Sequence, residues 1–267
     1  MRYVLKTLKN LLLVAIFVYV LFGIMLYVAQ DTFIMPGDNE RFEDCQRLPE
    51  AARPISHDGE RFFYANNSDD AIVVLYHGNA ASGCAFPEIA RTLERAGVSY
   101  IMTAYPGFAG DERRPDVGSM LDYTKTISGF IADEDYGDVM LIGYSIGGGA
   151  ASYHVTHAEV SSVFLISTFS RLSEVASGLY PIYPVRLLLK ENLLNDVWLM
   201  EHDGEITIVY TEDDIVVQSE HTERLIIRLE DAGKELEHHL VDGVNHGSII
   251  KDETLLMLLS EKIGQFG

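Results

Sequence analysis

The sequence predicts an α/β domain with a mostly parallel, doubly wound sheet, preceded by one N-terminal transmembrane helix. Two observations lead to this prediction. Short apolar stretches alternate with longer helical segments through residues 60–264, which is typical of strands that helices cover on both faces. An uncharged stretch at residues 11–29 comes before them and is about long enough to cross a bilayer. The remainder of the 267-residue chain is enough for one compact domain.

The N-terminal stretch predicts an anchor that stays on the protein. Arg2, Lys6 and Lys9 precede residues 11–29, and Asp31 follows them. The positive-inside rule then places the N-terminus in the cytoplasm and the domain outside it. A cleaved signal peptide is the alternative, but the apolar core is longer than usual and no clear small-residue cleavage site follows.

The chain is expected to divide into three parts, with one insertion. Residues 1–30 form the membrane anchor, residues 31–58 a linker leading into the domain, and residues 59–267 the domain itself. The insertion, at about residues 169–204, is predicted to form a short cap. Its aromatic and aliphatic side chains are expected either to line an acyl pocket or to pack a helix onto the sheet.

The elements of the domain follow from hydrophobic patterning. Residues 71–76 form a continuous apolar run, as expected for a strand buried on both faces. The other strands are expected at 60–64, 98–103, 139–144, 163–167, 205–210 and 236–241, and helices at 84–96, 117–132, 146–158, 218–232 and 248–264.

The most informative motif is Gly143-Tyr144-Ser145-Ile146-Gly147, which follows an apolar strand and opens into small, helix-compatible residues. Glycines leave room for a sharp turn from strand to helix, and a serine at its apex projects as a candidate nucleophile. A Gly-rich turn or a phosphate cradle is the alternative. No lysine follows the glycines, which argues against a Walker-type loop.

A serine hydroxyl needs a base and an orienting acid, and the chain offers both in the order that this turn requires. Asp213 and Asp214 follow the strand at 205–210, and Asp213 is the first choice for the acid, with Asp214 the alternative. His246 lies in a Gly-flanked loop after the strand at 236–241 and is the predicted base.

The stretch after the strand at 71–76 is His77-Gly78-Asn79. By position, the backbone N–H groups of Asn79 and of Ile146 are the predicted oxyanion donors. His77 is expected to brace this loop rather than to catalyse.

These motifs, in this order over roughly residues 60–265, resemble those of the alpha/beta-hydrolase superfamily. Within it the chain resembles membrane-anchored, small-cap serine hydrolases related to abhydrolase-domain acyl-thioesterases and lysophospholipases. One departure is Val217, because relatives usually carry a proline after the Asp-x-x-Val stretch. The resemblance implies that the proline sets a turn and touches no substrate.

Composition excludes some partners. The net charge of −20 makes nucleic acid an improbable partner, since binding it needs basic surface. No metal site is expected, because the spacing of His238, His239 and His246 fits no standard zinc pattern, and no cofactor is expected either. Cys45 and Cys84 both lie in the extracytoplasmic part, where a disulfide is permitted.

The resemblance implies hydrolysis of carboxylic esters or thioesters through an acyl-enzyme on Ser145. The membrane tether and the cap favour lipid-like acyl substrates, such as lysophospholipids, monoacylglycerols or lipidated proteins. Small soluble esters, peptides, acyl transfer and cofactor-free haloperoxidase chemistry remain alternatives on the same residues. A non-catalytic binding protein is a further alternative, and the complete set of triad residues argues against it.

Overall fold

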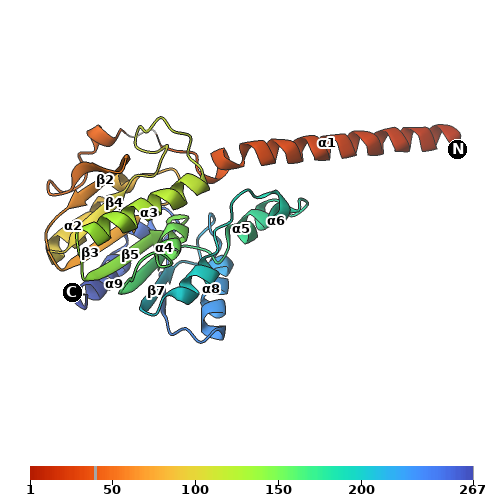
Figure 1. Ribbon diagram of the computed structural model, residues 1–267. Helices are drawn as coiled ribbons and strands as arrows, with labels where there is room; N and C mark the ends of the chain where they lie inside the picture. The colour runs from red at the N-terminus through yellow and green to blue at the C-terminus, as the bar shows by residue number, and fades with distance from the viewer. Residues whose placement is uncertain (39–40, 267) are drawn as a thin grey trace.

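The computed structural model describes residues 1–38 and 41–266, which form a long helix attached to an α/β domain (Figure 1). The domain contains one eight-stranded sheet with the order β1-β2-β4-β3-β5-β6-β7-β8. Strands β3 to β8 are parallel to one another, whereas β1 and β2 pair antiparallel at one edge. The strands are β1 (Arg53–His57), β2 (Glu60–Ala65), β3 (Ala71–Tyr76), β4 (Ser99–Thr103), β5 (Asp138–Tyr144), β6 (Ser162–Ile166), β7 (Glu205–Tyr210) and β8 (Glu237–Leu240).

Helices cover both faces of the sheet and create two hydrophobic cores. On one face, α3 (Val117–Asp133), α4 (Gly147–His154) and α8 (Ser219–Asp231) pack together with the residues of one core. On the other face, α2 (Pro87–Ala96) and α9 (Glu253–Gly264) pack against each other. Central strand β3 is buried throughout, and its side chains alternate between the two cores, as the apolar run predicted.

Each expected strand is present, and the differences lie at boundaries. Strand β1 falls in residues 31–58, which were expected to be only a linker; it forms because Arg53–His57 pairs in register with β2 through a tight turn. That turn carries two residues with positive φ, Asp58 and Gly59. The helix expected at 84–96 begins only at Pro87, since proline favours the first turn of a helix.

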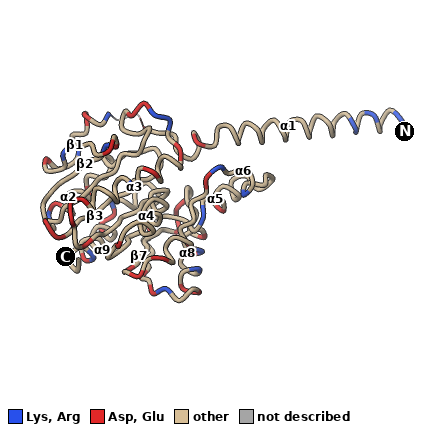
Figure 2. Tube along the Cα trace, viewed as in Figure 1, with Lys and Arg blue, Asp and Glu red and all other residues tan. Residues whose placement is uncertain are grey.

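Helix α1 (Arg2–Ile34) runs past the expected anchor limit at residue 30 and projects away from the domain (Figure 1). Figure 2 shows its Lys and Arg residues at the N-terminal end, followed by a long stretch without charge. Among the described residues, α1 is the one helix long and apolar enough to cross a membrane by length and composition. Its apolar side chains are largely exposed to the surroundings.

The segment between β6 and β7, which was expected to form a cap, contains four short helical elements. They are α5 (Leu172–Leu179), α6 (Val185–Leu188), α7 (Asn195–Trp198) and the 3₁₀ turn Leu199–Glu201. Two buried carboxylates hold the base of the cap to α8. Glu174 and Asp196 both accept from Arg228, at 2.7 Å and 3.1 Å, and Asp196 also pairs with Arg171 at 2.9 Å.

The permitted disulfide is present between Cys45 and Cys84. It closes a loop with a sequence separation of 39 residues. Restricting a loop of that length in the unfolded chain stabilises the folded state by about 2–4 kcal/mol.

We expect Cys45→Ala with Cys84→Ala to lower the free energy of unfolding by that amount in denaturant titration. The parent treated with reductant should match the double variant, and an unchanged transition midpoint in both would contradict the expectation.

A buried histidine on α4 predicts acid sensitivity. His154 accepts from or donates to the Tyr76 hydroxyl at 2.6 Å, and burial lowers its pKa from 6.5 to about 3. In the unfolded chain this histidine is protonated below about pH 6.5, whereas in the folded protein it stays neutral down to about pH 3. The free energy of unfolding therefore falls as the pH falls from about 6.5 to about 3. This histidine contributes a loss of about 2 kcal/mol between pH 7 and pH 5. Denaturant titrations at pH 7 and pH 5 measure this. We expect the free energy of unfolding of His154→Gln to fall between these pH values by about 2 kcal/mol less than that of the parent. Identical pH profiles would contradict the assignment.

Candidate active site

Ser145 sits on the turn that joins β5 to α4, and it is nearly buried at 4% exposure. Its φ of 56° lies in the left-handed region, which is uncommon for a residue with a side chain. Two hydrogen bonds hold the turn: the Ser145 N–H donates to the Ile166 carbonyl at 2.9 Å, and the Thr168 hydroxyl donates to the Ser145 carbonyl at 2.8 Å. The neighbouring strand therefore fixes the serine in its strained conformation.

Close packing explains why position 147, two residues after the serine, is a glycine. A Cβ at Gly147 would lie 2.1 Å from the Tyr76 carbonyl oxygen and 2.5 Å from that of His77. Helix α4 therefore begins against the end of β3, closer than any side chain permits. The sequence motif predicted this close approach, and the structure shows which backbone atoms require it.

Three side chains from three different loops meet at this turn. The Ser145 hydroxyl lies 3.0 Å from Nε2 of His246, and Nδ1 of the same ring lies 2.6 Å from Oδ2 of Asp214. The carboxylate accepts from Nδ1–H, so Nε2 is left as the acceptor of the serine proton. Loops far apart in sequence thus form a hydrogen-bonded chain from serine to acid.

The first choice for the acid, Asp213, does not join this chain. Its side chain is exposed, whereas that of Asp214 is buried at 1% exposure. The expectation was wrong by one residue, because the chain after β7 turns at Thr211, whose hydroxyl donates to the Val244 carbonyl at 2.8 Å and accepts from the Asp213 N–H at 3.3 Å. This turn directs the side chain of Asp214, and not that of Asp213, toward the histidine loop.

The backbone around Asp214 orients its carboxylate. Oδ1 accepts from the N–H groups of Val216 and Val217 at 2.9 Å and 2.8 Å, which leaves Oδ2 for the histidine. A proline at position 217 could not donate the second of these bonds. The valine that departs from the usual pattern thus supplies one of the two N–H groups that fix the acid.

Tyr144 supports the histidine and was not singled out from the sequence. Its hydroxyl donates to the His246 carbonyl at 2.7 Å, and the two rings lie 5.1 Å apart. Burial, with the negative charge of Asp214 nearby, raises the pKa of the Tyr144 hydroxyl, so it remains a donor. The sequence shows only that Tyr144 comes directly before the serine. Many residue types occur at that position, so the sequence did not indicate this role.

The predicted oxyanion donors come from two segments, and the first passes close to the serine, since a Cβ at Gly78 would lie 3.3 Å from that of Ser145. Asn79 follows β3 in an exposed loop, and Ile146 is the residue that precedes α4. Within residues 1–38 and 41–266, neither backbone N–H donates a hydrogen bond. Both are therefore available to a ligand.

The expectation that His77 braces this loop is confirmed. Its Nδ1 lies 2.8 Å from the Gly78 carbonyl, and its Nε2 accepts from the Tyr105 N–H at 3.3 Å. The Tyr105 hydroxyl in turn donates to the His77 carbonyl at 3.1 Å. Complete burial lowers the pKa of His77 to about 3, so the ring is neutral and matches these partners as one tautomer.

In the part of the chain that the structure describes, no three His, Cys, Asp or Glu side chains form a group that could hold a metal ion.

Comparison with curated proteins finds distant similarity. An uncharacterized protein of Mycobacterium tuberculosis, present in strains CDC 1551 and H37Rv, is 23% identical over 191 residues, which are 70% of this chain and 67% of that protein. No family model matches the chain.

Solved structures are similar to this chain over a larger share of its length than that relative is. A membrane phospholipase A described as a bacterial virulence factor is 17% identical, with a TM-score of 0.63 and coverage of 99% of both chains. An esterase from Exiguobacterium antarcticum is 20% identical, with a TM-score of 0.61 and coverage of 80% of this chain and 99% of that one. A puromycin-hydrolyzing peptidase of Mycobacterium tuberculosis is 14% identical, with a TM-score of 0.62; this chain spans 40% of its length.

The chain thus has the alpha/beta-hydrolase fold that its motifs predicted, with one apolar N-terminal helix. The turn carrying Ser145, the acid after β7 and the histidine after β8 lie at the carboxyl ends of parallel strands, where open sheets of this kind place their ligands.

The two neighbouring aspartates offer a matched pair of variants. Asp214→Asn should reduce the rate at which a fluorophosphonate labels Ser145 by roughly 10³–10⁴-fold, because the amide favours the wrong tautomer of His246. Asp213→Asn removes the same charge one residue away and should leave the rate within about twofold, since its side chain faces solvent. Time courses of labelling on the full chain measure both. Equal losses in the two variants, or a loss confined to Asp213→Asn, would contradict the geometry.

Proposed function

We propose that the protein is a serine hydrolase that cleaves carboxylic esters or thioesters through an acyl-enzyme, with Ser145, His246 and Asp214 as its catalytic triad. The observation that supports it most is the continuous hydrogen-bonded chain from the Ser145 hydroxyl through both ring nitrogens of His246 to a buried carboxylate. That arrangement turns a weak nucleophile into a reactive one. No metal or cofactor takes part in the proposed steps.

In the first half-reaction, Ser145 Oγ attacks the carbonyl carbon as Nε2 of His246 takes its proton. The carbonyl oxygen becomes an oxyanion, which the backbone N–H groups of Asn79 and Ile146 stabilise. Removing one such donor typically raises the barrier by about 2.7–4 kcal/mol. The tetrahedral intermediate collapses, and His246 gives its proton to the departing alcohol or thiol.

In the second half-reaction, water takes the place of the leaving group. His246 removes a proton from the water as it attacks the acyl-serine, and the same two N–H groups stabilise the new oxyanion. Collapse releases the carboxylic acid and returns the proton to Ser145. Throughout, Asp214 holds the imidazole in one tautomer and stabilises the imidazolium that forms twice in each cycle.

The substrates that we propose are lipid-like acyl esters near a membrane. Helix α1 has the length and apolarity of a bilayer span, and its basic N-terminal end favours a cytoplasmic N-terminus and an extracytoplasmic domain. The similarity to a membrane phospholipase A, which covers 99% of this chain, includes most of this helix and supports the same assignment. The disulfide suits an extracytoplasmic domain.

The test is hydrolysis of aryl acyl esters and acyl-thioesters, from acetate to palmitate, by the full chain in detergent micelles. Ser145→Ala should reduce turnover roughly 10⁵–10⁶-fold, which is to background, because it removes the nucleophile and leaves the fold intact. A rate that rises with acyl length supports lipid-like substrates, whereas a maximum at acetate points to a small-ester carboxylesterase. Turnover of peptide substrates alone would identify a peptidase, and turnover that survives Ser145→Ala would refute the assignment of the nucleophile.

A further inference from the structure

The outer end of the cap, residues 179–188, lies alongside α1 rather than over the sheet (Figure 1). The ring of Tyr183 stacks on that of Tyr19, with centroids 4.6 Å apart and an angle of 4° between the planes. The Tyr183 hydroxyl donates to the Tyr19 carbonyl at 3.0 Å, and the Tyr19 hydroxyl donates to the Ile182 carbonyl at 2.8 Å. Helix and cap therefore meet through a reciprocal pair of tyrosines. We call residues 179–188 the cap tip.

Helix α1 has a space that fits this contact. A Cβ at Gly23 would lie 3.0 Å from Cε1 of Tyr183, which is closer than ordinary van der Waals contact. Phe22 packs against the same ring at 5.8 Å between centroids. Tyr183 is only 8% exposed although it lies in the cap tip, because α1 covers it.

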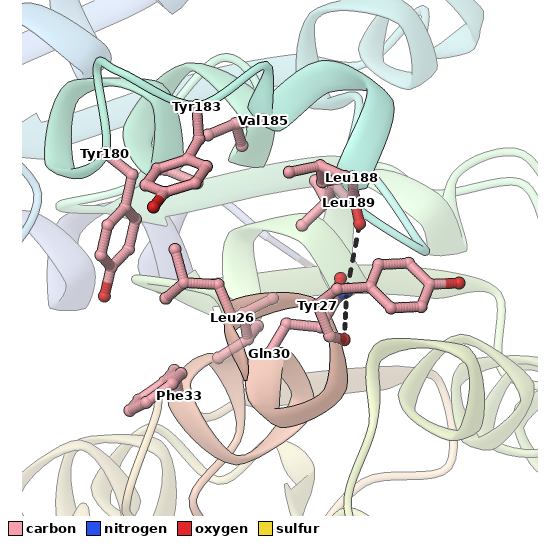
Figure 3. Close-up of a pocket in the computed structure, with 11 residues that line it drawn as sticks. Leu26, Tyr27, Gln30, Phe33, Tyr180, Tyr183, Val185, Leu188 and Leu189 are labelled. Carbon is pink, nitrogen blue, oxygen red and sulfur yellow. Dashed lines mark hydrogen bonds between the residues drawn. The ribbon is translucent and has the colours of Figure 1, made fainter. Parts of the chain in front are cut away.

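A second contact fixes the other end of the cap tip, nearer the domain. The Gln30 amide donates to the Leu188 carbonyl at 3.1 Å (Figure 3). It also accepts from the Lys190 N–H at 2.8 Å. The Lys190 ammonium pairs with Asp31 at 2.7 Å. Since polar and charged groups meet here, this level of α1 suits the boundary between membrane and water.

The two contacts are separated along α1 by slightly more than half the thickness of a bilayer's hydrocarbon core. Tyr19 precedes Asp31 by twelve residues, which is about 18 Å at 1.5 Å per residue. The hydrocarbon core of a bilayer is about 30 Å thick. If the uncharged part of α1 spans that core, the Tyr19–Tyr183 contact lies inside it, and the cap tip must lie there too.

The surface of the cap tip suits hydrocarbon. Leu179, Ile182 and Leu187 are 69%, 70% and 84% exposed, which is unusual for large apolar side chains in water. An apolar groove separates the cap tip from α1, and Figure 3 shows the side chains that line it, among them Leu26, Phe33, Tyr180 and Leu188. The one charged residue of the tip, Arg186, lies 3.8 Å from Glu174.

We propose that the cap tip inserts into the membrane leaflet next to α1, with lipid acyl chains covering its exposed apolar residues and filling the groove. The inference rests on the proposed membrane anchor, and it adds a second membrane-embedded segment, at residues 179–188. Leu26, Tyr27 and Phe33 of α1 line the groove, so the lipid that surrounds the helix is the occupant nearest to it. The leaflet thereby becomes a partner of the cap as well as of the anchor.

Depth-dependent quenching tests this in the full chain. Ile182→Cys carries an environment-sensitive fluorophore in phosphatidylcholine vesicles, and the native cysteines, being bonded, do not react. Val20→Cys on α1 is the membrane reference, and Met257→Cys on α9, where residue 257 is 65% exposed, is the water reference. Spin-labelled lipid should quench the fluorophore at 182 about as strongly as that at 20, and dissolved iodide should quench only that at 257.

Each other result overturns the inference. A label at 182 that iodide quenches as strongly as it quenches the label at 257 places the cap tip in water. A label at 20 that behaves in this way shows that α1 itself is outside the bilayer, which removes the anchor as well. Ester hydrolysis by the same samples is measured separately, so its failure is distinguishable from failure of the membrane contact.

A pair of variants tests whether α1 holds the cap tip in place. Gly23→Leu fills the space under Tyr183 and should reduce quenching of the label at 182 by spin-labelled lipid at least twofold. Ala15→Leu adds a larger side chain to the same helix, one turn or more from the cap, and should leave quenching unchanged. No difference between the two variants would overturn the role of the Tyr19–Tyr183 contact.

Discussion

The site depends on the close approach of α4 to the end of β3. Gly147 lies against the carbonyl groups of Tyr76 and His77, and this contact holds Ser145 in a left-handed conformation at the apex of the turn. The strain at this residue is maintained because the end of β6 and the loop after it hold the turn, through the Ile166 carbonyl and the Thr168 hydroxyl. The serine held in this way already lies 3.0 Å from Nε2 of His246, which is hydrogen-bonding distance.

The other parts of the site connect to this turn through short hydrogen-bonded links between loops. Thr211 binds the histidine loop through the Val244 carbonyl, and Tyr144 binds the same loop through the carbonyl of His246. The backbone thus fixes Asp214 and His246 relative to each other, and the carboxylate holds the ring through one hydrogen bond at 2.6 Å. A neutral His77 provides the corresponding support for the loop that carries Asn79.

Most of the domain could be predicted because its strands are short apolar runs and its turns carry glycines with a steric reason. The sequence could not distinguish Asp213 from Asp214, because two adjacent residues of the same type differ only in the direction that the turn gives their side chains. The hydrogen bonds of Thr211 set that direction. Strand β1 was missed because an edge strand with polar and exposed residues has little apolar signal. The contact between Tyr19 and Tyr183 joins residues 164 apart, and in sequence Gly23 looks like any small residue of an apolar helix.

The disulfide also constrains the biogenesis of the protein. Cys45 lies eleven residues after the end of α1 and Cys84 lies just after the loop with Asn79, so the bond ties the segment that follows α1 to that loop. Its formation requires that both thiols reach an oxidising compartment. In the proposed topology, a chain inserted the wrong way round would keep its domain in a reducing environment and its thiols free. The redox state of this one pair would then record the orientation in which each molecule entered the membrane.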